Sequence, residues 1–213
     1  MTVYNDQLSQ YISDTFAAQD EALRWAWEDT PRQGLPAISV RPEEGRFLQF
    51  LVRACGASKA VEIGTLGGYS GIWIARGLLP GGTLITLERE PAHAAVARKH
   101  FEAAGVADRV EIRIGDARES LRRLAAQGPF DFVFIDAEKS DYGAYWDWAL
   151  PNVRPGGIIA AHNAFRHGAI LDAGDRAAAT EAMRVFNRRV AAEPRVISTI
   201  FPGGDGMLVA VKK

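Results

Sequence analysis

Several features that would define a class of protein are scarce in this sequence of 213 residues. Its single cysteine, Cys55, excludes an internal disulfide bond and a zinc site built from several thiolates. Neither sign of charge is in excess, because 25 Lys and Arg face 26 Asp and Glu, so we expect no basic surface for nucleic acid. No apolar run approaches the roughly 18 residues that a membrane span needs, and repeats are lacking. These absences leave a globular protein whose partner is a small molecule.

Two local features add to these exclusions. The beginning of the chain, Met1 to Asp6, has neither a basic segment nor an apolar stretch, so the sequence predicts no signal peptide and a cytoplasmic protein. Cys55 lies at the apolar end of a predicted helix without a flanking cluster of cations, which indicates a buried structural thiol rather than a nucleophile.

The order of the elements predicts the fold. From Lys59 onward, short β-branched runs alternate with helical segments, which is typical of a parallel sheet with crossover helices. The predicted strands are 60–63, 83–87, 110–114, 132–135, 157–161, 196–201 and 207–211. The predicted helices between them are 70–78, 91–104, 118–126, 142–150 and 177–191.

The end of the chain breaks this alternation. Only residues 202–206 separate the last two strands, and five residues cannot hold a crossover helix, so these strands should form an antiparallel hairpin. The fold class is therefore α/β, with a mostly parallel seven-stranded sheet, an antiparallel hairpin at its end and helices on both faces. Residues 1–58 predict two helices, 6–27 and 42–54, joined by segment 30–42, and we assign them to the same domain as residues 59–213.

A glycine-rich segment, 61–71, ends the first predicted strand and opens the first helix of the sheet. Its glycines allow a sharp turn and a close approach of a ligand, at the edge where open α/β sheets bind ligands. It is not the dinucleotide fingerprint, because Leu66 stands where the second glycine would be and Glu62 puts a carboxylate near the pyrophosphate. A carboxylate there suits a cationic group such as an amino acid's ammonium, although a simple strand-to-helix turn is the alternative.

Polar side chains also follow the next three strands. Glu88 lies 24 residues after Gly64 (88 − 64), near the spacing of about 20 at which an acidic residue accepts ribose hydroxyls. Gly115-Asp116-Ala117 ends the third strand, where a turn could cover an adenine edge. Asp136 ends the fourth strand and suits a hard divalent cation, and Lys139 suits a general base. A solvated glutamate, a loop cap and a solvated lysine are the structural alternatives.

The ordered set of segments 61–65, 68–70, 115–117, 130–139 and 154–157 resembles one family. It is similar to the class I S-adenosylmethionine-dependent O-methyltransferases of the catechol and caffeoyl-CoA type, in their small bacterial form, over about residues 35–213. The resemblance implies a Rossmann-like methyltransferase fold, S-adenosylmethionine as cofactor, a small-molecule acceptor and a homodimer. It also implies Asp136 as a metal ligand and Lys139 as the base. The residues that it assigns to the cofactor are Val40, Glu62, Gly64, Thr65, Ser70, Glu88, Asp116, Ala117, Asp136 and Glu138, with 35–40 as a lid.

The chain departs from this family after the fifth strand. The family has an Asp-Asn pair of metal ligands there, and this chain has His162 and Asn163. An imidazole removes one negative charge and a hard oxygen, which weakens a magnesium site more than a site for manganese, iron or zinc. Three outcomes stay open: a borderline metal on Asp136, His162 and Asn163, a weakened magnesium or calcium site, or no metal and His162 as an acid/base or a hydrogen-bonded loop residue.

The next residues differ as well, because Arg166 and His167 replace an apolar pair. They make this wall of the site more cationic, which favours an acceptor with a carboxylate or phosphate, unless Arg166 simply faces solvent. The sequence thus predicts O-methyl transfer to a catechol-like hydroxyl, assisted by a divalent metal. A metal-independent methyltransferase that uses Lys139 and His162, a catalytically silent cofactor-binding protein and a nicotinamide-dependent dehydrogenase are the rival hypotheses.

Overall fold

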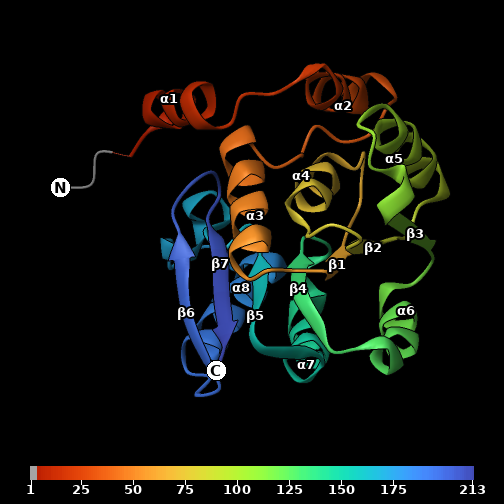
Figure 1. Cartoon of the computed structure of the whole chain (residues 1–213). Helices are drawn as coiled ribbons and strands as arrows, with labels where there is room; N and C mark the ends of the chain where they lie inside the picture. Colours follow the sequence, from red (N-terminus) through yellow and green to blue (C-terminus); the bar gives the residue numbers. More distant parts are fainter. Residues whose placement is uncertain (1–3) are drawn as a thin grey trace.

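The computed structural model describes residues 4–213 and is built around a seven-stranded sheet in the order β3-β2-β1-β4-β5-β7-β6 (Figure 1). The strands are β1 (Lys59–Ile63), β2 (Thr83–Glu88), β3 (Val110–Ile114), β4 (Phe130–Ile135), β5 (Val153–Ala161), β6 (Val196–Phe201) and β7 (Met207–Lys212). The five strands β3-β2-β1-β4-β5 pair in parallel, in that order across the sheet. Strand β7 pairs antiparallel with both β5 and β6. The predicted α/β class and its terminal hairpin are therefore confirmed.

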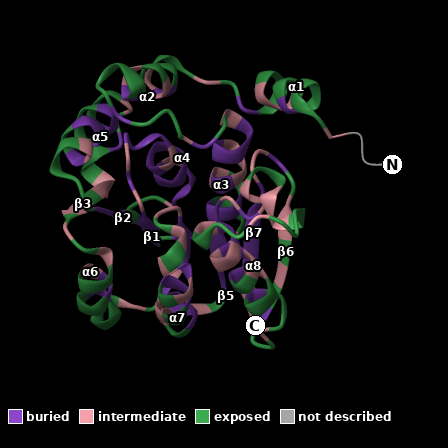
Figure 2. Ribbon diagram, turned by 180° about the vertical axis from the view of Figure 1, so that it is seen from behind, coloured by how far each residue is buried: buried purple, intermediate pink, exposed green. Residues whose placement is uncertain are grey.

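Helices cover both faces of the sheet because its central strands are apolar on both sides. Alternation along β1 puts Ala60 into the core under α3, α4 and α5, and Val61 and Ile63 into the core under α6, α7 and α8. Figure 2 shows the central strands largely buried, the edge strands β3 and β6 partly exposed and the outer surfaces of the helices exposed. The helices are α1 (Asp6–Phe16), α2 (Glu21–Arg32), α3 (Pro42–Ala54), α4 (Tyr69–Gly77), α5 (Pro91–Ala103), α6 (Ala117–Leu124), α7 (Tyr142–Asn152) and α8 (Ala178–Ala191).

The segment before the sheet differs from the prediction. The single helix expected over 6–27 is two helices, because the Asp20 side chain accepts a hydrogen bond from the Leu23 backbone N–H at 3.0 Å and starts α2 anew. The second helix continues through Pro31 to Arg32, so the start of the predicted linker is helical. The expectation for the beginning of the chain falls partly on residues 1–3, which lie outside the described part.

Two smaller features also bear on the sequence predictions. Strand β5 begins at Val153, four residues earlier than expected, and its pairing with β4 shifts register between Phe130 and Phe132. Cys55 is half-buried, and burial raises the pKa of its thiol to about 11, which supports a structural rather than a nucleophilic role. None of the helices within residues 4–213 combines the length and the apolar character that crossing a bilayer would require.

Candidate active site

A cavity of about 990 Å³ opens at the carboxyl edge of the parallel strands. Its walls come from the segment before α3, the turn after β1, the loops after β4 and β5, and the β6–β7 loop. This is the edge at which open α/β sheets bind their ligands. Most residues singled out from the sequence line this cavity: Val40, Gly64, Thr65, Ser70, Asp136, Glu138, Lys139, His162, Asn163, Arg166 and His167.

The turn after β1, residues 64–67, packs against the end of β4 at this cavity, and we call it the glycine turn. Gly64 has a φ of +100°, and a side chain there would collide with the backbone carbonyl of Asp136. A glycine at this position therefore lets the turn after β1 and the residue at the end of β4 share one site. Residues 64–67 form part of the cavity wall.

Glu62 supports this turn from behind. The carboxylate is fully buried and accepts hydrogen bonds from the hydroxyls of Ser70, at 2.6 Å, and Thr86, at 2.7 Å. Thr86 in turn lies 2.6 Å from the Thr65 hydroxyl. Burial raises the pKa of Glu62 to about 7, although the two hydrogen bonds act in the opposite direction. Glu62 thus fixes Ser70 directly and Thr65 through Thr86. Ser70 and Thr65 line the cavity, and Glu62 does not.

The other acidic candidates of this half lie at the same sheet edge but outside the cavity lining. Glu88 accepts hydrogen bonds from the backbone N–H groups of Leu66, at 2.8 Å, and Glu90, at 2.9 Å. Asp116 caps the first turn of α6 through the Glu119 N–H at 3.0 Å, and Ala117 follows it as the first helical residue. The ribose and adenine roles of these residues stay predictions.

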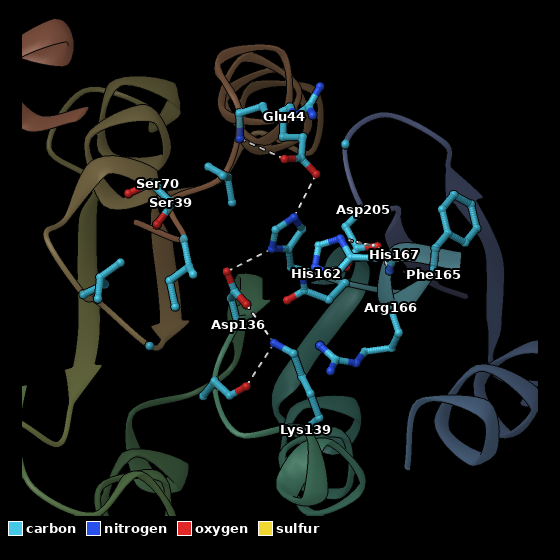
Figure 3. Close-up of a pocket in the computed structure, with 18 of the residues that line it drawn as sticks. Ser39, Glu44, Ser70, Asp136, Lys139, His162, Phe165, Arg166, His167 and Asp205 are labelled. Atoms are coloured by element: carbon cyan, nitrogen blue, oxygen red, sulfur yellow. Dashed lines mark hydrogen bonds and ion pairs between the residues drawn. The ribbon is translucent and has the colours of Figure 1, made fainter. Parts of the chain in front are cut away.

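Asp136 and Lys139 form the polar centre of the other half. The Lys139 ammonium contacts the Asp136 carboxylate at 3.1 Å, the Ala137 carbonyl at 3.0 Å and the Tyr142 hydroxyl at 2.8 Å. Burial alone would raise the pKa of Asp136, but the positive charges of His162 and Lys139 hold it well below its ordinary value. Asp136 is therefore an anion held between two cations (Figure 3).

His162 bridges two carboxylates. Its Nδ1 lies 3.1 Å from Asp136, and its Nε2 lies 2.8 Å from Glu44, a buried residue of α3. Since both partners are acceptors, both ring nitrogens must carry hydrogen to make both bonds. Burial alone would lower the pKa of His162, but Asp136 and then Glu44 raise it to about 10. The ring is an imidazolium at neutral pH, with neither nitrogen free to bind a metal.

Asn163, the third expected metal ligand, is also directed elsewhere. Its amide donates a hydrogen bond to Asp205 of the β6–β7 loop at 2.9 Å. Within residues 4–213, no group of three or more His, Cys, Asp and Glu side chains is arranged to hold a metal ion. Asp136, His162 and Asn163 lie together as the sequence predicts, but in this arrangement they satisfy one another and their neighbours instead of converging on one point.

Arg166 and His167 lie in a strained stretch of the cavity wall, in the loop after β5. Both have a positive φ, of 50° and 53°, and the neighbouring Gly168 has a φ of 86°. Arg166 extends toward Lys139 in Figure 3, and its charge opposes the rise that burial causes in the pKa of Tyr142. The His167 side chain is 81% exposed and lies 3.6 Å from Asp205.

Sequence reasoning missed Glu44, Tyr142 and Asp205. Glu44 is the third residue of α3 and accepts from the Arg41 backbone N–H at 2.8 Å, so its position in the sequence indicates only a helix cap. Tyr142 starts α7 among aromatic residues that indicate core. Asp205 lies in a Gly-rich hairpin turn, where aspartate is common. No local signal distinguishes any of the three as part of a site.

Comparison with known proteins gives a consistent result. The sequence model of a family described as O-methyltransferase matches residues 13–213. A catechol O-methyltransferase of Niastella koreensis is 43% identical over 98% of this chain and 97% of its own length. A catechol O-methyltransferase of Mycobacterium tuberculosis is 41% identical over 94% of this chain and 93% of its own length.

Solved structures agree with the sequence matches. The crystal structure of an O-methyltransferase from Bacillus cereus in complex with SAH superimposes with a TM-score of 0.90 and 42% identity. The alignment covers 97% of each chain. The likeness therefore spans both the sheet and the helices that precede it.

Proposed function

The chain belongs to the O-methyltransferase family, and we propose that it transfers the methyl group of S-adenosylmethionine to a hydroxyl of a small phenolic acceptor. That it is an S-adenosylmethionine-dependent O-methyltransferase follows from the family and its relatives. The observation that carries the finer proposal is the cavity itself, because the glycine turn and Lys139 both line it.

The glycine turn holds the cofactor in this proposal. Gly64 lets the main chain approach the methionine part, and the hydroxyls of Thr65 and Ser70, fixed by Glu62, bind its polar ends. Glu88 and the Asp116-Ala117 turn take the ribose and the adenine, since they lie at the same edge on the next two strands. The buried hydrogen bonds behind the turn keep these groups in place before the cofactor arrives.

The donor set does not fit a divalent cation as it is arranged, so we derive no step through a metal. Both nitrogens of His162 are committed to carboxylates, and the Asn163 amide is committed to Asp205. This favours the metal-independent alternative that uses Lys139 and His162 over the metal-assisted reaction. An ion between Asp136 and His162 would have to break their mutual contact.

Lys139 and His162 then carry the chemistry. Lys139 first releases its ammonium proton to solvent, and the amine then takes the proton of the acceptor hydroxyl while the oxygen forms a bond to the methyl carbon and the carbon–sulfur bond breaks. The electron pair of that bond stays on sulfur and neutralises its charge. The His162 imidazolium is a fixed positive charge that stabilises the developing phenolate before attack. The intact Asp136–Lys139 pair argues against a silent cofactor-binding protein.

Replacement of Lys139 tests this proposal. With catechol as acceptor, Lys139→Met should lower kcat by about a hundredfold to ten-thousandfold, the usual contribution of a general base. Lys139→Arg should fail equally, because a guanidinium keeps the charge but does not accept a proton. S-adenosylhomocysteine should bind both variants as it binds the parent, which separates chemistry from cofactor binding. A fast Lys139→Met variant would contradict the base assignment.

The homodimer and the cytoplasmic location stay predictions. Exposed apolar side chains on α1, Tyr11 and Phe16, are compatible with a partner surface. The mass of the protein in solution would test the dimer.

A further inference from the structure

Arg166 is a cation of the cavity wall that lacks an acidic partner. It forms no ion pair with a carboxylate of residues 4–213, and its Nε atom is buried without a hydrogen-bond partner. Other cations of the wall are paired: Arg41 with Asp6, at 3.1 Å, and Lys139 with Asp136. A buried donor left without an acceptor costs free energy unless a ligand completes it.

The backbone around Arg166 is held in place from two sides. Asp205 accepts from the His167 backbone N–H, and the backbone of Phe165 donates to the Asp205 carbonyl at 2.9 Å. From α8, the Arg184 guanidinium binds the carbonyl oxygens of Ala169, at 2.7 Å, and Ile170, at 3.0 Å. Left-handed conformations at two consecutive non-glycine residues persist only where the surroundings enforce them. The enforced conformation directs the Arg166 side chain into the cavity. A flexible surface loop would instead leave this side chain in solvent.

Two large apolar side chains also line the cavity. Ile38 and Leu171 both line the cavity, and they are 67% and 86% exposed. Exposed aliphatic side chains in a cavity wall offer apolar contact to a flat aromatic ring. The wall therefore offers apolar contact for a ring, with Lys139 and Arg166 as polar groups at its edge (Figure 3).

We propose that Arg166 binds a carboxylate of the acceptor, so that the preferred substrate is an anionic phenol such as a dihydroxybenzoate or a hydroxycinnamate. This inference rests on the proposed function, since it assumes that the acceptor's hydroxyl lies at Lys139. A planar guanidinium matches a carboxylate through two parallel hydrogen bonds. A phosphate-rich acceptor such as a coenzyme A thioester would favour a cluster of cations, whereas the neighbouring His167 already lies beside Asp205.

The test compares two acceptors that differ in charge but little in size. We would measure kcat/KM with a dihydroxybenzoate carrying adjacent hydroxyls and with the corresponding dihydroxybenzyl alcohol. The parent should prefer the acid by at least about tenfold, as expected for a charge-assisted bidentate contact. Arg166→Met should lower kcat/KM for the acid by about tenfold to a hundredfold and lower the ratio of kcat/KM for the acid to that for the alcohol by at least about tenfold. Arg166→Lys should fall between parent and Arg166→Met.

The matched control is Arg176→Met, which removes the same charge from an exposed residue paired with Glu181 outside the cavity. It should preserve the preference for the acid. An equal loss with both acceptors in Arg166→Met, or a parent without preference, would overturn the proposal.

Failure of the proposed function would give a different result. If neither acceptor is methylated, O-methyl transfer to phenols is wrong, and the affinity of the S-adenosylhomocysteine complex for the dihydroxybenzoate still decides the role of Arg166. Calorimetric binding that disappears in Arg166→Met but not in Arg176→Met would support the carboxylate site. Equal binding by all three proteins would overturn it.

Discussion

His162 donates a hydrogen bond from Nε2 to the carboxylate of Glu44 at 2.8 Å, across 118 positions of sequence. The contact joins the end of β5 to the first turn of α3 inside the cavity. The β6–β7 loop closes over it, because a side chain at Gly204 would collide with the Glu44 carboxylate. Glu44 and Asp136 together fix the orientation of the imidazolium.

We predict that Glu44 is a positioning residue for His162. Glu44→Leu removes the acceptor, so the ring loses its second anchor and kcat should fall by about tenfold or more, the scale of one hydrogen bond to a buried charge. Glu44→Gln offers a carbonyl oxygen at the same place and should restore most of kcat. The KM for S-adenosylmethionine should change little in either variant. A Glu44→Leu protein that is folded and has the parent's kcat would contradict the role.

A second prediction concerns metal ions. Activity of the parent should survive a chelator, and calorimetric titration of Mg, Mn, Co, Ni and Zn salts into the chelator-treated protein loaded with S-adenosylhomocysteine should show no saturable site. His162→Asp should gain such a site, because a second carboxylate beside Asp136 gives the oxygen donors that Mg²⁺ prefers. One-site binding by the parent, with activity lost on chelation, would restore the metal-assisted reaction that the sequence predicts.

A third prediction follows from the buried carboxylate of Glu62. Its pKa is raised from 4.5 to about 7, so between these pH values the folded protein binds more protons at this site than the unfolded chain. The contribution of Glu62 to stability is therefore complete below the lower value and falls as the pH rises through the window. Glu62→Gln lacks this titration. Its free energy of unfolding relative to the parent should rise by up to about 3 kcal/mol from pH 4.5 to 8.

Urea unfolding of both proteins across this pH range measures the difference. The exposed Glu28→Gln variant is the control and should follow the parent at every pH. A constant difference between Glu62→Gln and the parent would mean that the pKa of Glu62 is the same in the folded protein and in the unfolded chain.

Much of the site could be predicted from the sequence because strand ends are local signals. Asp136 and His162 each directly follow an apolar strand, and parallel strands bring their carboxyl ends to one edge. The hairpin was equally predictable, since a five-residue connection leaves few topologies. These inferences need only the period of the pattern and the length of a connection.

Other features depend on contacts distant in sequence and carry no such signal. Glu44 looks like a helix cap and is one, and only the folded chain brings its second oxygen to His162. The strained backbone at Arg166 is held by Asp205, from a hairpin 39 positions later (205 − 166), and by Arg184 of α8. The break between α1 and α2 was a local feature that the prediction missed, because Asp20 caps a helix inside a continuous apolar stripe.

The last prediction concerns His100, a fully buried residue of α5 that contacts the glycine turn from outside the cavity. Its Nδ1 lies 2.7 Å from the Gly67 carbonyl oxygen and its Nε2 lies 3.2 Å from the Asp29 carboxylate of α2. Thr30 packs against Gly67 so closely that a side chain there would collide with it. Through these contacts, helices α2 and α5 clamp the turn that binds the methionine part in our proposal.

His100→Leu should therefore weaken binding of S-adenosylhomocysteine by about tenfold, because the Gly67 carbonyl loses its buried donor and the turn is no longer held. Asp29→Asn should have a smaller effect, since it keeps an acceptor oxygen for the ring. The matched control is Lys99→Met, an exposed neighbour on the same helix, which should bind as the parent does. Calorimetry gives the affinities, and unfolding curves show whether each variant is folded at the assay temperature. If folded His100→Leu binds with the parent's affinity, the clamp stabilises the fold without shaping the cofactor site.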